Sequence, residues 1–537
     1  MASAMGLPKA SSAELPLLGA FEFKFSFSRF MRFIGPGLLM SIAYVDPGNL
    51  ESDLQVGARA GYSLLWVLLW STVLGYVLQM QAAKLGVVTR KNLAEHCRAR
   101  FTPGPRLLLW AMAEIAIIGS DVQEVIGSAI AILLLTGGAV PLWGGILISA
   151  AAAFLLLLVE RLGVRHLEAL FALLISTMVG AFLHMYVVAG VPTAQVLRGF
   201  LVPWVPRQSV GQAVAMLGSL LMPHNLYLHS ALVQTRRLRA QDEGHRREAL
   251  AYFGLESALS LGVSVLINTC VVCVFAAGYF GRPEVEDIGL ENAGQYLGAT
   301  YGAGIVVIWA LGLLAAGQSS TMTGCYTGQF VMGGFLHFQV SAWVRILVTR
   351  LVALVPTLAV AFLSGGAGSS ALDRLNQVLN LLQSVQLPFA LLPVLAFNAD
   401  PSLMGPFANS APATAALSAA SAAVVGINLA GVWAFAGEHL AGAPAAAWGG
   451  AGAGVVVYMG LLAYVVAAIR RGPPEGCGGG YGGDAVVISA VAEGGGGGGG
   501  GDLAEPLLGP APPAAAAAAA AARAAEEGLG AWPAGAA

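Results

Sequence analysis

The chain has 537 residues, of which 57% are hydrophobic and only 10% are charged. Soluble domains carry charge on about a quarter of their residues, so this composition excludes a soluble enzyme. The formal net charge of −2 gives no sign of a nucleic-acid partner. The sequence therefore predicts an all-α polytopic protein embedded in a lipid bilayer.

About twelve apolar segments are each long enough to cross a hydrocarbon core of ~30 Å as a helix. A short N-terminal segment, residues 1–32, precedes them, and a Gly- and Ala-rich tail, residues 470–537, follows them and is expected to be disordered. The spans are expected near residues 33–53, 62–84, 106–136, 140–159, 167–190, 210–234, 250–279, 302–336, 342–364, 375–397, 411–436 and 447–469.

Lysine and arginine are distributed unequally between the two sides of these spans. About twenty fall in the segments on the side of the N-terminus, and the other side holds Arg59, Arg198, Arg207, Arg282 and Arg374. By the positive-inside rule, both termini are expected in the cytosol. Dileucine-like pieces at 14–18 (ELPLL) and 502–508 (DLAEPLL) are possible sorting signals for coat adaptors. A plasma, vacuolar or endosomal membrane fits equally.

Two spans contain helix-breaking residues at their middles. The first has SIAYVDPGN at 41–49, and the sixth has LMPHN at 221–225. Proline removes a backbone donor, so each helix should unwind there and free its carbonyls, which membranes tolerate only where they line a protein cavity. Paired breaks in corresponding halves predict a transporter site at the midplane, between inverted five-span repeats at 33–190 and 209–397, with two further spans in 411–469.

The residues at these breaks form a candidate cation site of mixed chemistry. Asp46 supplies a negative charge, Asn49 an amide oxygen and Met222 a thioether, and the unwound backbone can add the carbonyls of Ala43 and Ser219. Calcium and magnesium prefer oxygen ligands alone, so the thioether favours manganese, iron and later first-row metals. A buried methionine is also ordinary packing material, which is the alternative interpretation of Met222.

The third span carries Asp121 and Glu124, which lie on one helix face. Acids inside a membrane are costly, so they predict a proton or ion path, with His224 as a relay from Asp46. The alternative is structural: Arg236 or Arg350 neutralises the pair, because buried acids are usually paired. In the eighth span, the small polar residues between 318 and 323 could line the path, but most of them are expected to join helices by hydrogen bonds.

The breaks DPGN and MPHN, together with GQSSTMTGCYTGQFVMGGF at 317–335, resemble the NRAMP family of proton-coupled divalent-metal transporters. The resemblance implies the leucine-transporter fold and metal binding by the five donors named above. It also implies that Asn380 of the tenth span joins them in occluded states, and that Asp46 and the acid pair move protons. Relatives commonly have Glu where this chain has Gly333, so a cytosolic salt-bridge gate based on that acid is in doubt.

The sequence therefore predicts a transporter, not an enzyme, that imports manganese or ferrous iron, and also cadmium, into the cytosol with protons and without a cofactor. One alternative is a receptor or metal sensor on a transporter-like core, although the tail is too poor in apolar residues to form a signalling domain. Another is a cation-coupled amino-acid transporter on the same fold, although Asp46 would repel a substrate carboxylate.

Overall fold

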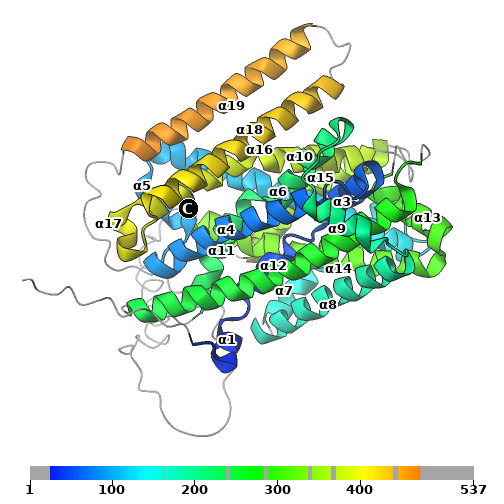
Figure 1. Cartoon of the computed structure of the whole chain (residues 1–537), viewed down its shortest axis with the longest axis horizontal. Helices are drawn as coiled ribbons and strands as arrows, with labels where there is room; N and C mark the ends of the chain where they lie inside the picture. The colour runs from blue at the N-terminus through cyan, green and yellow to red at the C-terminus, as the bar shows by residue number, and fades with distance from the viewer. Residues whose placement is uncertain are drawn as a thin grey trace, which may run out of the picture. The chain divides into compact units, whose positions relative to one another are not determined.

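The computed structural model describes residues 24–471 except 162–163, 237–241, 283–287, 337–341, 364–370 and 440–444. Regular structure within these ranges is helical (Figure 1). The helices of the first half are α1 (Phe27–Phe33), α2 (Pro36–Ile42), α3 (Pro47–Ala60), α4 (Leu65–Thr89), α5 (Leu93–Arg100), α6 (Pro103–Leu135), α7 (Leu142–Arg161), α8 (Val164–Val188) and α9 (Thr193–Leu201). Those of the second half are η1 (Arg207–Ser209), α10 (Val210–Leu220), α11 (Pro223–Leu232), η2 (Val233–Thr235), α12 (Glu243–Tyr279), α13 (Leu290–Tyr301), α14 (Ala303–Leu336), α15 (Ala342–Leu363), α16 (Ala371–Ala399), α17 (Pro401–Met404), η4 (Gly405–Phe407), α18 (Ala411–His439) and α19 (Ala445–Arg471).

The helices agree with the predicted spans. Among the described residues, eight helices are long and apolar enough to cross a membrane: α4, α6, α8, α12, α14, α16, α18 and α19. Shorter apolar stretches within α7 and α15, Leu142–Phe154 and Leu347–Phe362, match two further predictions. The remaining two predicted spans are each built from a pair of short helices, α2 with α3 and α10 with α11.

Short helices between the spans were not predicted from the sequence. α5 begins with a capping box, in which Asn92 Oδ1 accepts from the Glu95 backbone N–H at 3.0 Å and Glu95 Oε2 accepts from the Asn92 backbone N–H at 2.7 Å. α9 and α13 lie in the connections after α8 and α12. These helices are too short for a membrane span, so a search for long apolar runs passes over them.

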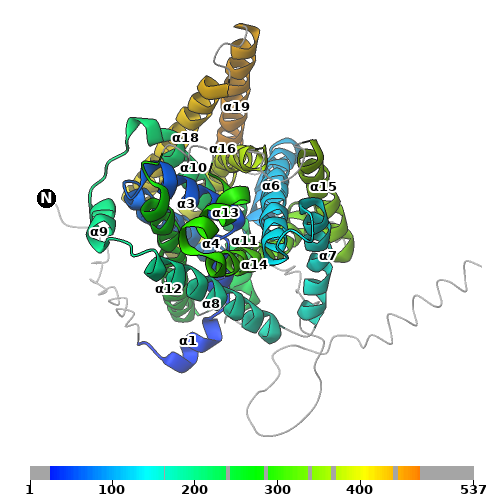
Figure 2. The same ribbon diagram turned by 90° about the vertical axis from the view of Figure 1, so that its right-hand side faces the viewer.

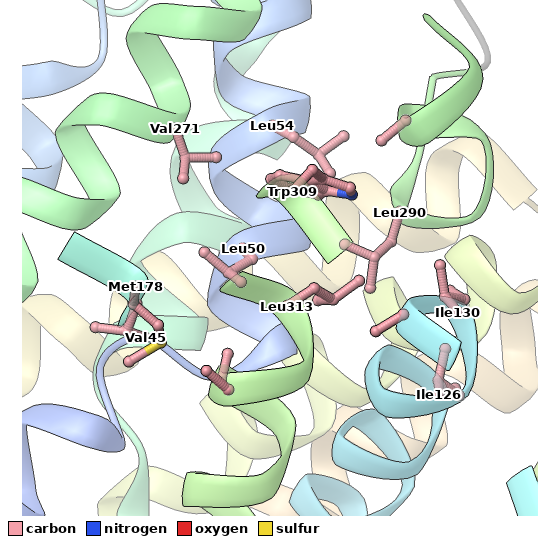
Figure 3. Close-up of a cluster of buried hydrophobic side chains, with 14 of the residues drawn as sticks. Val45, Leu50, Leu54, Ile126, Ile130, Met178, Val271, Leu290, Trp309 and Leu313 are labelled. Atoms are coloured by element: carbon pink, nitrogen blue, oxygen red, sulfur yellow. The ribbon is translucent and has the colours of Figure 1, made fainter. Parts of the chain in front are cut away.

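The largest buried apolar cluster joins α3, α6, α8, α12 and α14, and Figure 3 shows part of it around Trp309. Two glycines allow the first broken span to sit close to its neighbours. A Cβ at Gly57 of α3 would lie 2.3 Å from the backbone oxygen of Val272 in α12, and one at Gly127 of α6 would lie 2.4 Å from Pro47 Cβ. Pro47, at the first break, therefore packs directly against α6.

The last two spans are peripheral to this core. α18 and α19 pack against α16, at one edge of the bundle (Figures 1 and 2). α16 itself packs against α6, α10 and α11, so it connects the edge helices to both broken spans. The breaks thus lie among α6, α12, α14 and α16. The division into inverted repeats at the residues given above stays a prediction. The N-terminal segment before residue 24, the tail after residue 471 and both dileucine-like pieces lie outside the described residues.

Candidate metal centre and proton path

The first broken span unwinds at the predicted place. α2 ends at Ile42 and α3 begins at Pro47, whose missing N–H and fixed φ suit the first position of a helix. Asp46 caps α3: its Oδ1 accepts from the Asn49 backbone N–H at 2.7 Å and from Asn49 Nδ2 at 2.9 Å. Asn49 Nδ2 also lies 3.4 Å from the Ala43 carbonyl. These bonds fix the Asp46 carboxylate at the break, where Asn49 also contacts the Ala43 carbonyl.

Asn49 keeps one atom available for a cation. Its side chain is buried, and its Oδ1 is buried without a hydrogen-bond partner among the described residues. A buried amide oxygen that has neither a hydrogen-bond donor nor a cation beside it costs free energy. Because Nδ2 bonds to Asp46, Oδ1 is the atom of this side chain that is able to bind a cation.

The second broken span unwinds between Leu220, the end of α10, and Pro223, the start of α11. Met222 occupies the cap position of α11 with extended backbone and without a side-chain cap bond. Its thioether is buried, with 2% of the residue exposed. The next two polar residues are less satisfied: His224 Nδ1 and both amide atoms of Asn225 are buried without a hydrogen-bond partner among the described residues.

A single small cavity joins the two breaks to the third span. It contains the proposed metal donors Ala43, Asp46 and Met222 together with the proposed proton groups His224 and Glu124. Its remaining lining comes from α6 and α14, from Ser120, Ser320, Thr323 and Gly324. A carboxylate, a thioether and a backbone carbonyl therefore share one space with an imidazole and a second carboxylate.

The acid pair of α6 is buried against an arginine of α15. Arg350 Nη2 lies 3.6 Å from Asp121 Oδ1 and 3.3 Å from Glu124 Oε2, and all three side chains are at most 3% exposed. Ser120 Oγ donates to Glu124 Oε1 at 3.2 Å. Gly324 of α14 permits this packing, because a Cβ there would lie 3.0 Å from Asp121 Oδ1. Arg350 holds two carboxylates, of which Glu124 also reaches the cavity.

A model of the family described as natural resistance-associated macrophage protein-like (Nramp) matches residues 37–434. The chain is 51% identical to metal transporter Nramp2 of Populus trichocarpa over 71% of this chain and 72% of the relative. It is 52% identical to the metal transporter nramp1 homolog of Dictyostelium discoideum over 71% of this chain and 70% of the relative. The chain belongs to the Nramp family.

One solved structure agrees with this membership, and a second shows the fold alone. A crystal structure of the Eremococcus coleocola manganese transporter matches 86% of this chain and 98% of its own, with a TM-score of 0.75 and 28% identity. Mhp1, a nucleobase-cation-symport-1 family transporter, matches 82% of this chain and 95% of its own, with a TM-score of 0.50 and 13% identity. The Nramp chain thus has the leucine-transporter-like fold of a multi-pass membrane protein, and it is a transporter and not an enzyme.

Three predicted donors of this Nramp protein, Asn49, Ser219 and Asn380, are not among the residues that line the cavity. Ser219 is near the end of α10, where its hydroxyl donates to the Met216 carbonyl at 3.1 Å. Asn380 of α16 accepts from Gln123 Nε2 at 2.7 Å, and its Nδ2 lies 3.3 Å from the Gly48 carbonyl. Asn380 therefore contacts the start of α3 through the Gly48 carbonyl. Its role in occluded states stays a prediction.

The structure corrects the role considered for Arg236. Arg350 lies with the acid pair, whereas Arg236 lies beside the start of α2, where its guanidinium donates to the Ile34 carbonyl. Arg236 is at the end of η2, and sequence distance alone could not show that this end faces the first broken span. Arg236 is accordingly not assigned to the proton path.

Some residues of the site were missed by the sequence analysis. Gln123 bridges α6 to α16, since its Oε1 accepts from Gln383 Nε2 at 2.7 Å and its Nε2 donates to Asn380. The available signal was the spacing of Asn376, Asn380 and Gln383, which puts three amides on one face of α16. Ser320 and Thr323 belong to the group that could line the path or join helices, with helix joining favoured for most of its members, and both line the cavity.

Proposed function

We propose that this Nramp protein is a secondary active transporter that moves manganese or ferrous iron, and also cadmium, into the cytosol together with protons. Its relatives bear the names of metal transporters, and one solved relative is described as a manganese transporter. The observation that carries the proposal is the shared cavity, in which Asp46 and Met222 lie with Glu124 and His224.

In this proposal, the substrate metal binds Asp46, the vacant Oδ1 of Asn49, the thioether of Met222 and backbone carbonyls including that of Ala43. Ser219 contributes its carbonyl when the second break adjusts. Hard cations gain little from a thioether, so the donor set favours softer divalent metals over calcium and magnesium. Among the described residues, no group of three or more His, Cys, Asp or Glu side chains is close enough to form another metal site.

The proton path begins at Asp46, which cannot keep its proton while it binds a cation. His224 and Glu124 are the other two titratable residues that line the cavity, and we propose that the proton passes to His224 and then to Glu124. Glu124 passes the proton to Asp121 within the ion-pair group of Arg350. The positive charge of Arg350 offsets the repulsion between the two carboxylates, so either carboxylate can accept the transferred proton.

The orientation follows from the charge bias of the loops, with both termini in the cytosol and import directed toward them. Two competing functions have less support. An amino-acid substrate would place its carboxylate beside Asp46, and like charges repel there. A receptor function would need a signalling domain, and no feature of the described chain favours one.

Reconstituted protein tests the proposal. Proteoliposomes containing a pH-sensitive dye should take up manganese, iron and cadmium down an imposed proton gradient, with the internal pH falling as metal enters. Calcium uptake should remain near that of empty liposomes. Metal uptake that leaves internal pH unchanged would refute proton coupling, and equal uptake of calcium would refute the donor assignment.

A further inference from the structure

Immediately before the first broken span lies α1, a seven-residue helix with the sequence FSRFMRF. At 100° per residue, Phe27, Phe30, Met31 and Phe33 share one side of the helix, and Ser28, Arg29 and Arg32 share the other. Seven residues rise only about 10 Å, so α1 cannot cross a bilayer. It is a short amphipathic helix at the entrance of a membrane span.

Only part of its apolar side is covered by protein. Phe30 and Phe33 are buried against α12, where the Phe33 ring stacks on Tyr252 with centroids 5.2 Å apart and meets Phe253 edge-on at 5.4 Å. Phe27 and Met31 of the same side remain 67% and 44% exposed. Figure 1 shows α1 beside α12. Exposing these two apolar side chains to water would cost free energy.

The position of α1 along the membrane normal is set by its attachments. Only Ile34 and Gly35 separate it from α2, and the Gly35 N–H donates to Glu256 of α12. Gly35 has φ 140°, a conformation that favours glycine, so the chain turns sharply here. Since α2 begins the span expected at 33–53, we expect α1 at the level of the headgroups beside it.

Positive charge surrounds the polar side of α1. Arg32 is exposed, Lys24 precedes the helix, and Arg29 pairs with Glu248 of α12 at 2.6 Å. Exposed apolar rings beside basic side chains are the pattern of helices that lie in a membrane interface. The basic residues match the charge of anionic headgroups, each contributing about 1 kcal/mol near such a surface.

We propose that α1 is an interfacial helix that binds an anionic lipid surface, with Phe27 and Met31 in the acyl boundary and Arg32 and Lys24 at the headgroups. The proposal rests on the membrane span that α2 and α3 form together, and it is independent of the metal that the protein carries.

A fluorophore attached at position 27 tests this in the full-length chain. Cys97, Cys270, Cys273 and Cys325 are buried, so labelling Phe27→Cys requires only replacement of Cys477 by Ser. In phosphatidylcholine vesicles containing phosphatidylserine, the label should show the blue-shifted emission of an apolar environment. The matched control is Ser28→Cys, an exposed position on the polar side of the same helix, whose label should stay in water.

Charge selection is tested by Arg32→Gln, with Arg282→Gln as a control that removes an exposed arginine elsewhere. Arg32→Gln should lower the ratio of inserted to exposed label up to about five-fold in anionic vesicles, and Arg282→Gln should not. The proposal is overturned by a water-exposed label at position 27, or by insertion that ignores both phosphatidylserine and Arg32. A shift that grows with the protein-to-lipid ratio would identify a second copy as the occupant and also overturn it.

Discussion

The two broken spans use the same device, a proline that starts the second helix of the span, yet they differ in how their polar atoms are satisfied. At the first break, Asp46 and Asn49 bond to each other and leave one amide oxygen vacant. At the second, His224 Nδ1 and both amide atoms of Asn225 have no partner among the described residues. We therefore propose that the first break is already arranged to bind a cation, whereas the second break changes its contacts when the metal binds.

The largest effect on metal uptake is expected from a substitution at the first break. Asp46→Ala removes the formal charge from the proposed ligands, and manganese uptake into proteoliposomes should fall more than about 100-fold, since even outer partners of metal ligands are worth 10–100-fold. The variant should still fold, because the substitution also removes a buried carboxylate. Wild-type uptake by a monodisperse Asp46→Ala protein would contradict the assignment of the site.

The acid pair should affect coupling more than binding. Glu124→Gln keeps the shape of the side chain but cannot titrate, so manganese binding should persist while the number of protons moved per metal falls. Arg350 retains Asp121 at 3.6 Å, and thermal stability should therefore change little. If the variant instead unfolds, as a buried arginine stripped of its partner would by about 3–5 kcal/mol, the pair is structural.

At the second break, Met222→Ala should alter the selectivity among metals more than it alters total transport. A thioether helps soft cations most, so cadmium uptake should fall most and manganese less, while calcium begins to compete. Removing the side chain also leaves room for a water molecule, a ligand that calcium accepts readily. The assay is uptake of labelled manganese against excess calcium, and unchanged competition would mean that Met222 only packs.

The smallest effect compares the two breaks directly through matched asparagines. Asn49→Ala loses the hydrogen bond to the Asp46 carboxylate and should lower the free energy of unfolding by about 1.5–3 kcal/mol. Asn225→Ala removes two unsatisfied atoms, so its thermal stability should equal or exceed that of the wild type. Equal losses in the two variants, measured by thermal denaturation in detergent, would remove the distinction between the breaks.

Much of this fold could be predicted because a membrane span requires a long apolar helix, and proline marks the positions where such a helix is interrupted. The breaks at Pro47 and Pro223 lie where the sequence placed them. Which of two arginines meets Asp121 could not be predicted, since it depends on how α15 and η2 are oriented across more than a hundred residues. The amide bridge from Gln123 to α16 was missed because a neutral side chain among apolar ones carries no charge to reveal it.

X-ray absorption of cadmium-loaded protein is the most direct test of the claim that one metal ion binds both breaks. We expect one sulfur and several oxygen neighbours around cadmium in the wild type, and oxygen neighbours alone in Met222→Leu. A wild-type shell without sulfur, or a sulfur neighbour that persists in Met222→Leu, would contradict it.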